Sequence, residues 1–86
     1  MNFERTERFR RAYQSLPSST RTRVDKTIDL LALNPRHPSL RLKKVQGETD
    51  IWEARVDRSH RMTLEIREGY YLLRNVGKHG ETLGRP

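Results

Sequence analysis

The residues best suited to chemistry lie in two segments, 51–57 and 61–67, that alternate between apolar and polar or charged positions. Alternation with a period of two is typical of a β-strand with one buried face and one solvated face. The turn at 57–60 predicts that the two strands form a hairpin, which would bring Arg55 and Arg61 within reach of one ligand. The residues expected on the shared polar face are Glu53, Arg55, Arg61, Thr63 and Glu65.

More basic residues flank this hairpin in the sequence. Those expected near the same face, from the preceding strand, the turn and the last strand, are Lys43, Lys44, Arg58, Arg74 and Lys78. His79 follows in a segment with Gly77 and Gly80 on either side. Glycine permits sharp turns and a close approach of the backbone. An imidazole placed beside cations can exchange protons near neutral pH.

Together these side chains could cleave RNA. That reaction needs a base for the 2′-hydroxyl, cations for the phosphate and an acid for the leaving 5′-oxygen, and acid–base help contributes about 10²–10⁴-fold. Arg55 and Arg61 suit the phosphate, and His79 or a lysine suits the acid. The base could be Glu53 or one of the lysines at 43–44. The alternative is an ordinary solvated face, where Arg–Glu pairs across strands explain the same residues without a ligand.

The histidines do not form a metal site in the sequence. His37, His60 and His79 lack the spacing of metal ligands, and no carboxylate completes a set. We therefore expect no metal and no other cofactor. His37, in a proline-rich loop, and His60, in a turn, fit structural roles.

Composition limits the classes of protein that this chain can belong to. Its 86 residues fit one domain, 1–86, with a thin core. It has no cysteine, and no apolar run approaches the roughly 20 residues of a membrane span. We therefore expect a cytoplasmic protein that does not enter the membrane. A net charge of +7, carried mainly by arginine, favours a polyanionic partner, with RNA the best candidate.

Two helices should precede the strands. The apolar residues of the first, Phe9, Tyr13 and Leu16, share one helical face, and Pro17 ends the helix. Ser18 or Ser19 could cap a second helix that ends near 34–35. Its apolar stripe consists of Val24, Ile28 and Leu31.

Four strands are expected at 40–45, 51–57, 61–67 and 70–76, with only weak support for another at 2–3. The order predicts an α+β fold in which an N-terminal helical hairpin packs on a twisted antiparallel β-sheet. The sheet residues expected to contact the helices are Trp52, Val56, Met62, Leu64 and Ile66.

With these elements in place, the sequence resembles the RelE/ParE superfamily of bacterial type II toxins. The resemblance covers nearly the whole chain. It is carried by four short pieces in a fixed order: KKVQG at 43–47, IWEAR at 51–55, SHR at 59–61 and VGKHG at 76–80.

The resemblance implies roles for several residues. In the RelE-like mRNA interferase branch, a concave face binds mRNA in the ribosomal A site and cuts it. Arg61 matches an arginine implicated in catalysis, and His79 matches a C-terminal position that active members fill with arginine or histidine. Arg55 matches a basic position of the same pocket. Residues 43–44 lie where RelE-like members place catalytic lysines, and of the two we expect Lys44 to be catalytic and Lys43 to bind phosphate.

The sequence also departs from the pattern of this family. Ser39 stands where members of the YoeB type have a glutamate base, and the tail at 81–86 lacks the functional tyrosine of many active members. Three functions therefore remain open: an mRNA endonuclease acting on the ribosome, a ParE-like inhibitor of DNA gyrase, and a binding module without catalysis. All three include an acidic antitoxin that is partly disordered alone and becomes ordered on binding.

Overall fold

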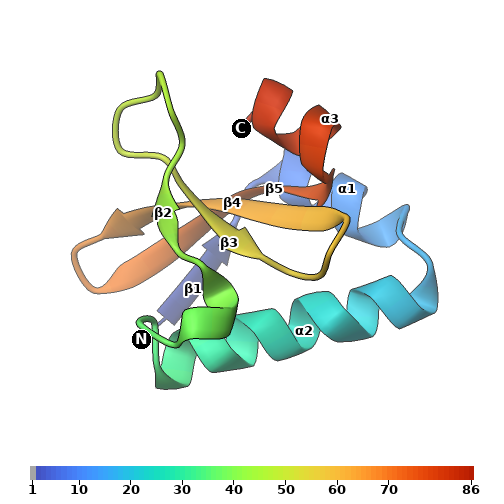
Figure 1. The fold of residues 1–86 in the computed structure, drawn as a ribbon, viewed down its shortest axis with the longest axis horizontal. Helices are drawn as coiled ribbons and strands as arrows, with labels where there is room; N and C mark the ends of the chain where they lie inside the picture. The colour runs from blue at the N-terminus through green and yellow to red at the C-terminus, as the bar shows by residue number, and fades with distance from the viewer. Residues whose placement is uncertain (1) are drawn as a thin grey trace.

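The computed structural model describes residues 2–86 (Figure 1). The chain begins with strand β1, Asn2–Arg5, which leads into two helices, α1, Glu7–Gln14, and α2, Ser18–Leu33. A 3₁₀ turn, η1, Pro38–Leu40, connects α2 to the remaining strands. These strands are β2, Lys43–Lys44, β3, Trp52–Arg55, β4, His60–Arg67, and β5, Tyr70–Lys78, and a short helix, α3, His79–Gly84, follows them.

The strands form one five-stranded sheet in the order β1-β5-β4-β3-β2. The antiparallel pairing predicted for β2 to β5 is confirmed, but β1 pairs with β5 in parallel, so the sheet is mixed. Parallel pairing is possible because α1 and α2 carry the chain across the sheet before it returns. Phe3 then packs against Tyr71, with their ring centroids 5.4 Å apart.

The predicted helices are present, and both contribute to the core. Thr6 caps α1 by accepting a hydrogen bond from the Phe9 backbone N–H. The predicted serine cap of α2 is wrong, because Ser18 is already helical and Pro17 occupies the capping position without a side-chain hydrogen bond. Proline suits this place because it has no N–H to leave unpaired. The Tyr13 hydroxyl joins the helices by donating to Asp25 over 2.7 Å.

The core lies between the two long helical segments and one face of the sheet. Met62 and Leu64 are fully buried, as predicted, while Trp52 and Val56 are partly buried against the same cluster. The prediction that Ile66 packs against the helices is wrong, since it is 43% exposed. It lies near the β4–β5 turn, which projects beyond α2 (Figure 1). The core cluster consists of Phe9, Val24, Ile28, Leu31, Leu40, Ala54, Met62, Leu64, Tyr71, Leu73 and Val76.

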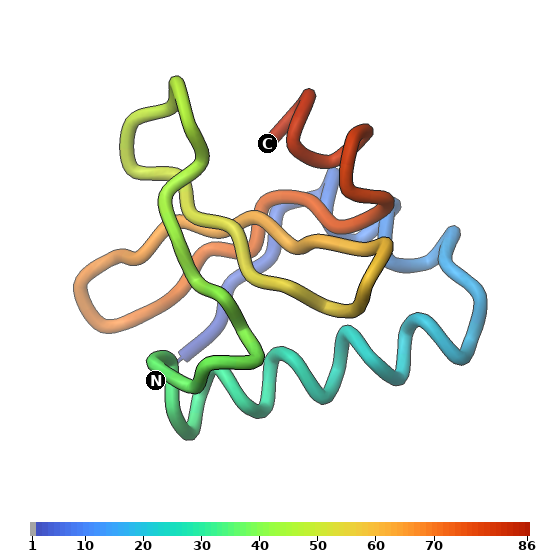
Figure 2. Tube along the Cα trace, in the orientation of Figure 1, coloured from blue at the N-terminus to red at the C-terminus, as the bar shows by residue number. Residues whose placement is uncertain are grey.

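The alternation predicted that the other face of the sheet is solvated, and this prediction is wrong for part of that face. α3 lies across it, on the opposite side of the sheet from α2 (Figure 2). The Thr63 hydroxyl donates to the backbone oxygen of Pro86 over 2.9 Å, and the Asn75 amide donates to that of Arg85 over 3.0 Å. Beneath α3 and the C-terminal residues, Thr63 is fully buried, and Glu53 and Glu65 are almost fully buried.

Two local features depart from the predicted strand boundaries. The strand expected at 40–45 is only two residues long, because Leu40 belongs to η1 and Arg41 adopts a left-handed conformation with φ of 46°. β5 continues to Lys78, and a register shift opposite Thr63 and Leu64 interrupts its pairing with β4. Among residues 2–86, no helix combines the length and the apolar character needed to cross a membrane.

Candidate active site

The register of β2, β3 and β4 places several predicted site residues together. Arg55 lies directly opposite Arg61, and Glu53 lies opposite Thr63 on one side and Lys43 on the other. Side chains of directly paired residues share one face of an antiparallel sheet. The predicted juxtaposition of the two arginines is therefore confirmed, and Lys43 joins Glu53 on the same face.

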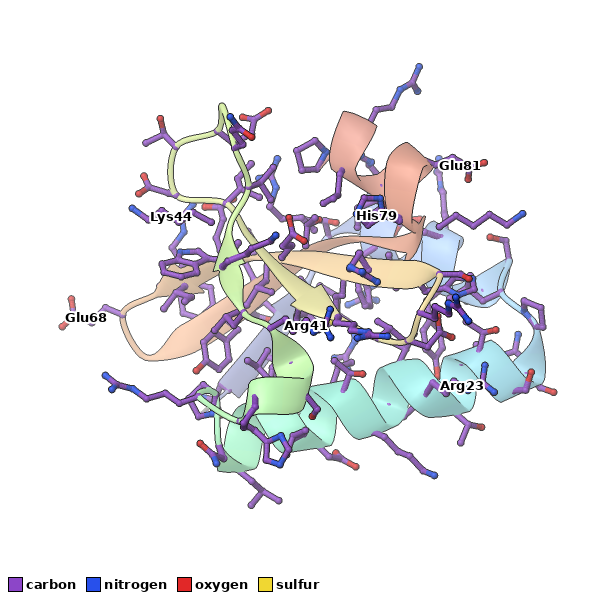
Figure 3. All side chains as sticks on the ribbon, in the orientation of Figure 1. Arg23, Arg41, Lys44, Glu68, His79 and Glu81 are labelled. Atoms are coloured by element: carbon purple, nitrogen blue, oxygen red, sulfur yellow. The ribbon has the colours of Figure 1, made fainter. Side chains whose placement is uncertain are left out.

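A cleft of about 480 Å³ opens on this face between β2, β3 and α3. Glu53 lies at its base and is only 7% exposed. His79, the first residue of α3, lines the cleft from the opposite side (Figure 3). Arg61 lies next to Glu53, with its Nε 4.0 Å from Glu53 Oε1. The residues that line the cleft are Lys43, Lys44, Val45, Gln46, Glu53, His79 and Leu83.

The two arginines are held by the backbone of the β3–β4 turn. Arg61 Nη1 donates to the backbone oxygens of Asp57, over 2.7 Å, and His60, over 2.9 Å. Arg55 Nε donates to the same Asp57 oxygen over 3.4 Å. Arg55 does not line the cleft of His79. It lines a neighbouring cleft of about 560 Å³ that also contains Ser39.

The two adjacent lysines occupy different environments. Lys44 is paired with Trp52, and its ammonium lies 5.7 Å from the centroid of the Trp52 ring, a cation–π arrangement. Its side chain extends on the side of β2 away from His79 (Figure 3). Lys43 faces Glu53 instead. Sequence reasoning favoured Lys44 as the catalytic lysine, whereas the geometry favours Lys43.

Three further predicted residues lie outside the cleft. Arg74 forms an ion pair with Glu65 and donates to the backbone oxygen of Pro86, so it helps to hold the C-terminal segment. Burial works to raise the pKa of Glu65, but Arg74 and Arg67 outweigh it and hold that pKa below its usual value. Lys78 lines a separate cleft together with His60, and Arg58 lies exposed in the β3–β4 turn.

The other two histidines have structural contacts. His37 Nδ1 accepts a hydrogen bond from the Ser39 backbone N–H and so caps η1. His60 Nδ1 lies 2.9 Å from Asp57 Oδ1. Among residues 2–86, no group of three or more His, Asp or Glu side chains is placed to hold a metal ion.

Asp57 is the residue that sequence reasoning missed. Burial works to raise its pKa, but hydrogen bonds from the His60 ring and from the backbone N–H groups of Ser59 and His60 lower that pKa to about 2. Arg23 of α2 also pairs with it over 3.2 Å. The signal was present, because an aspartate at the start of a tight turn often accepts from N–H groups two or three residues later.

Comparison with known proteins connects this geometry to one group of folds. No family model and no curated protein matches the sequence. Solved structures do match. A YoeB/ParE toxin from Agrobacterium tumefaciens has a TM-score of 0.78 at 14% identity, covering 92% of this chain and 99% of its own. YafQ from E. coli strain BL21(DE3) has a TM-score of 0.77 at 12% identity, covering 94% of this chain and 96% of its own.

An archaeal complex extends the same similarity. The RelE–RelB complex from Pyrococcus horikoshii OT3 matches with a TM-score of 0.72 at 19% identity, over 99% of this chain and 97% of the matched chain. At such low identity the likeness concerns the path of the backbone. The chain therefore has the RelE/ParE-like toxin fold, as the sequence resemblance predicted.

Proposed function

We propose that this chain is the toxin of a type II toxin–antitoxin system and acts as a metal-independent mRNA endonuclease that stops translation on the ribosome. The observation that carries this proposal is the cleft in which Lys43, Glu53 and His79 meet, with Arg61 behind the carboxylate. The site lies in a fold that known toxins share.

Each group in the cleft has a role in this chemistry. Glu53 accepts the proton of the 2′-hydroxyl, whose oxygen then attacks the adjacent phosphorus. Arg61 and Lys43 stabilise the negative charge that develops on the phosphate. His79 donates a proton to the 5′-oxygen as the bond between that oxygen and phosphorus breaks. Acid and base help of this kind is worth about 10²–10⁴-fold.

The residues that line the cleft support a reaction on the ribosome. Of the described residues that line it, none is a phenylalanine, tyrosine or tryptophan. Stacking on such rings contributes roughly 1–3 kcal/mol per base when a protein binds single-stranded RNA. A free strand would therefore be held mainly through its phosphates, and the ribosome would supply the missing orientation of the codon.

The experiment that tests the proposal is inducible expression with mapping of transcript ends. Wild type should stop growth and leave cleaved mRNA, whereas Arg61→Ala and His79→Ala should relieve both effects. Arg8→Ala, on the exposed surface of α1, is the matched control for loss of a positive charge. A double variant of Arg61 and His79 that is as toxic as wild type would show that the site is assigned wrongly.

A second candidate function is inhibition of DNA gyrase without RNA cleavage. It is favoured by the tail at 81–86, which contains no tyrosine, and by Ser39 at the position where a glutamate base is expected. DNA-damage signalling with intact mRNA would support it. A pure binding module predicts neither effect. It predicts RNA binding whose affinity falls steeply with salt, because each neutralised phosphate adds to the slope.

We also propose an acidic antitoxin as the partner, and the cytoplasm as the location. The net charge of +7 suits an acidic chain. Several of the matched structures are toxin–antitoxin complexes, among them one from E. coli and one from P. horikoshii. Co-expression with the product of a neighbouring reading frame should yield a stable complex. This part of the proposal would be contradicted if the isolated chain is stable and no neighbouring reading frame encodes a protein that binds it.

A further inference from the structure

We infer that Asp57 is a positioning residue, whose side chain fixes the β3–β4 turn so that the backbone oxygens of Asp57, Ser59 and His60 hold Arg55, Arg61 and His79. Its part in cleavage rests on the proposed function. The contacts themselves do not, and they can be tested separately.

The Asp57 carboxylate gathers donors from two elements. Its Oδ1 accepts from the backbone N–H groups of Ser59 and His60, each over 2.8 Å, and lies 2.9 Å from His60 Nδ1. Its Oδ2 accepts from Arg23 Nη1 of α2 over 3.2 Å. Hydrogen bonds to an ionised acceptor are roughly twice as strong as those between neutral groups. The carboxylate therefore determines the conformation of the turn and its place against α2.

The β3–β4 turn also holds residues from three elements. The Asp57 backbone oxygen accepts from Arg61 of β4 and Arg55 of β3. The Ser59 backbone oxygen accepts from the backbone N–H of His79 over 2.8 Å, which attaches the start of α3. Any change in the turn would move all three at once, although they lie up to 24 positions apart in the sequence.

This arrangement has a clear use for phosphate chemistry. An arginine side chain loses rotamer freedom when it is immobilised, and a ligand that had to order it would bind less tightly. Anchoring Arg61 in advance removes that cost at the moment of reaction. Misplacement of a positioned group by about 1 Å can lower a rate by about 10²-fold.

Asp57 does not act on the substrate itself. Its side chain is only 20% exposed, and its oxygens are occupied by four donors. Positioning is the role that its contacts support.

Three substitutions of Asp57 distinguish the effect of its hydrogen bonds to the turn, which cap the turn, from the effect of its negative charge. Asp57→Ala removes both the cap and the charge. Asp57→Asn keeps an oxygen that can cap the turn but removes the charge, whereas Asp57→Glu keeps the charge but places it one methylene too far away to cap. Arg23→Ala, which removes only the link to α2, is the control.

The direct measurement is ¹⁵N relaxation of the Arg61 Nε–Hε group by NMR, and it does not depend on cleavage. We expect an ordered group in wild type, Asp57→Asn and Arg23→Ala. In Asp57→Ala and Asp57→Glu the order parameter should fall to the range of flexible groups, below about 0.6. Equal order of Arg61 in all variants would overturn the inference, and the Asn and Glu variants decide the matter if the alanine variant does not fold.

The second measurement is cleavage of mRNA on translating ribosomes. We expect kcat to fall about 10²-fold in Asp57→Ala and Asp57→Glu, with KM nearly unchanged, and to recover in Asp57→Asn. If Arg61 loses its order but kcat stays at the wild-type value, the inference is wrong. If wild type cleaves nothing while Arg61 still depends on the cap, the proposed function fails and the positioning role stands.

Discussion

The two faces of the sheet are buried in different ways. The face toward α1 and α2 is covered by a continuous apolar cluster that includes Phe9, Met62 and Leu64. The face toward α3 buries Thr63 completely and Glu53 and Glu65 nearly so. Buried polar groups cost free energy unless they are paired, so the second face must satisfy each of them with a specific partner. The first face therefore stabilises the fold through buried apolar surface area, and the second holds charged side chains in fixed positions.

Truncation of the apolar face should have the largest effect on folding. Leu64→Ala removes a fully buried side chain and leaves a cavity, so the free energy of unfolding should fall by about 2–5 kcal/mol. That is a large part of the stability of a small domain. Urea unfolding followed by circular dichroism measures it. A loss below about 1 kcal/mol would mean that this face does not form the main core.

Glu65→Gln tests the charged face by an intermediate effect. The substitution keeps the shape but removes the negative charge between Arg67 and Arg74, which should cost about 1–3 kcal/mol. The neighbouring Glu68→Gln is the control, because Glu68 is exposed. Unfolding of both variants in urea at neutral pH gives the comparison. Equal stability of the two would mean that the buried pairs contribute nothing.

Gly77→Ala tests how closely α3 approaches the sheet. An added Cβ would lie 3.0 Å from Thr82 Oγ1, so the buried Thr82 side chain would have to move by a few tenths of an ångström. We expect a loss of about 1 kcal/mol, within the range for overpacking. Thr82→Ala in the same chain removes the clashing atom and should recover part of the loss. A double-mutant cycle with no coupling would contradict this contact.

A further expected effect, confined to acid pH, is carried by Asp57. Its pKa in the folded protein is about 2 against an ordinary value of 3.8, so its contribution is complete above about pH 4 and is lost as the pH falls through 2. The carboxyl is partly solvated, which limits the contribution to about 1–2 kcal/mol. The difference in stability between wild type and Asp57→Asn should therefore shrink between pH 5 and pH 2. A constant difference would refute it.

Local patterns in the sequence were enough to predict much of the fold. Alternation predicted β3 and β4, and the turn between them set the register that places Arg55 opposite Arg61. The stripe of Val24, Ile28 and Leu31 predicted the buried face of α2, which the structure confirms. These features depend on the period of side chains along a strand or helix, which neighbouring residues express directly.

The features that the sequence did not reveal depend on contacts between distant segments. Whether Lys43 or Lys44 faces Glu53 follows from the pairing of β2 with β3, and a shift by one residue would exchange them. The parallel addition of β1 to β5 likewise joins opposite ends of the chain.

The burial of the charged face by α3 also depends on contacts between distant segments. α3 has six residues, two of them glycine, and a helix this short is not stable alone in water. It forms where Thr82 packs close to Gly77 of β5, and where the backbone oxygens of residues 85–86 accept hydrogen bonds from Thr63 of β4 and Asn75 of β5. Periodicity within each segment therefore predicted which elements form, whereas only packing between segments decided which charges are buried together.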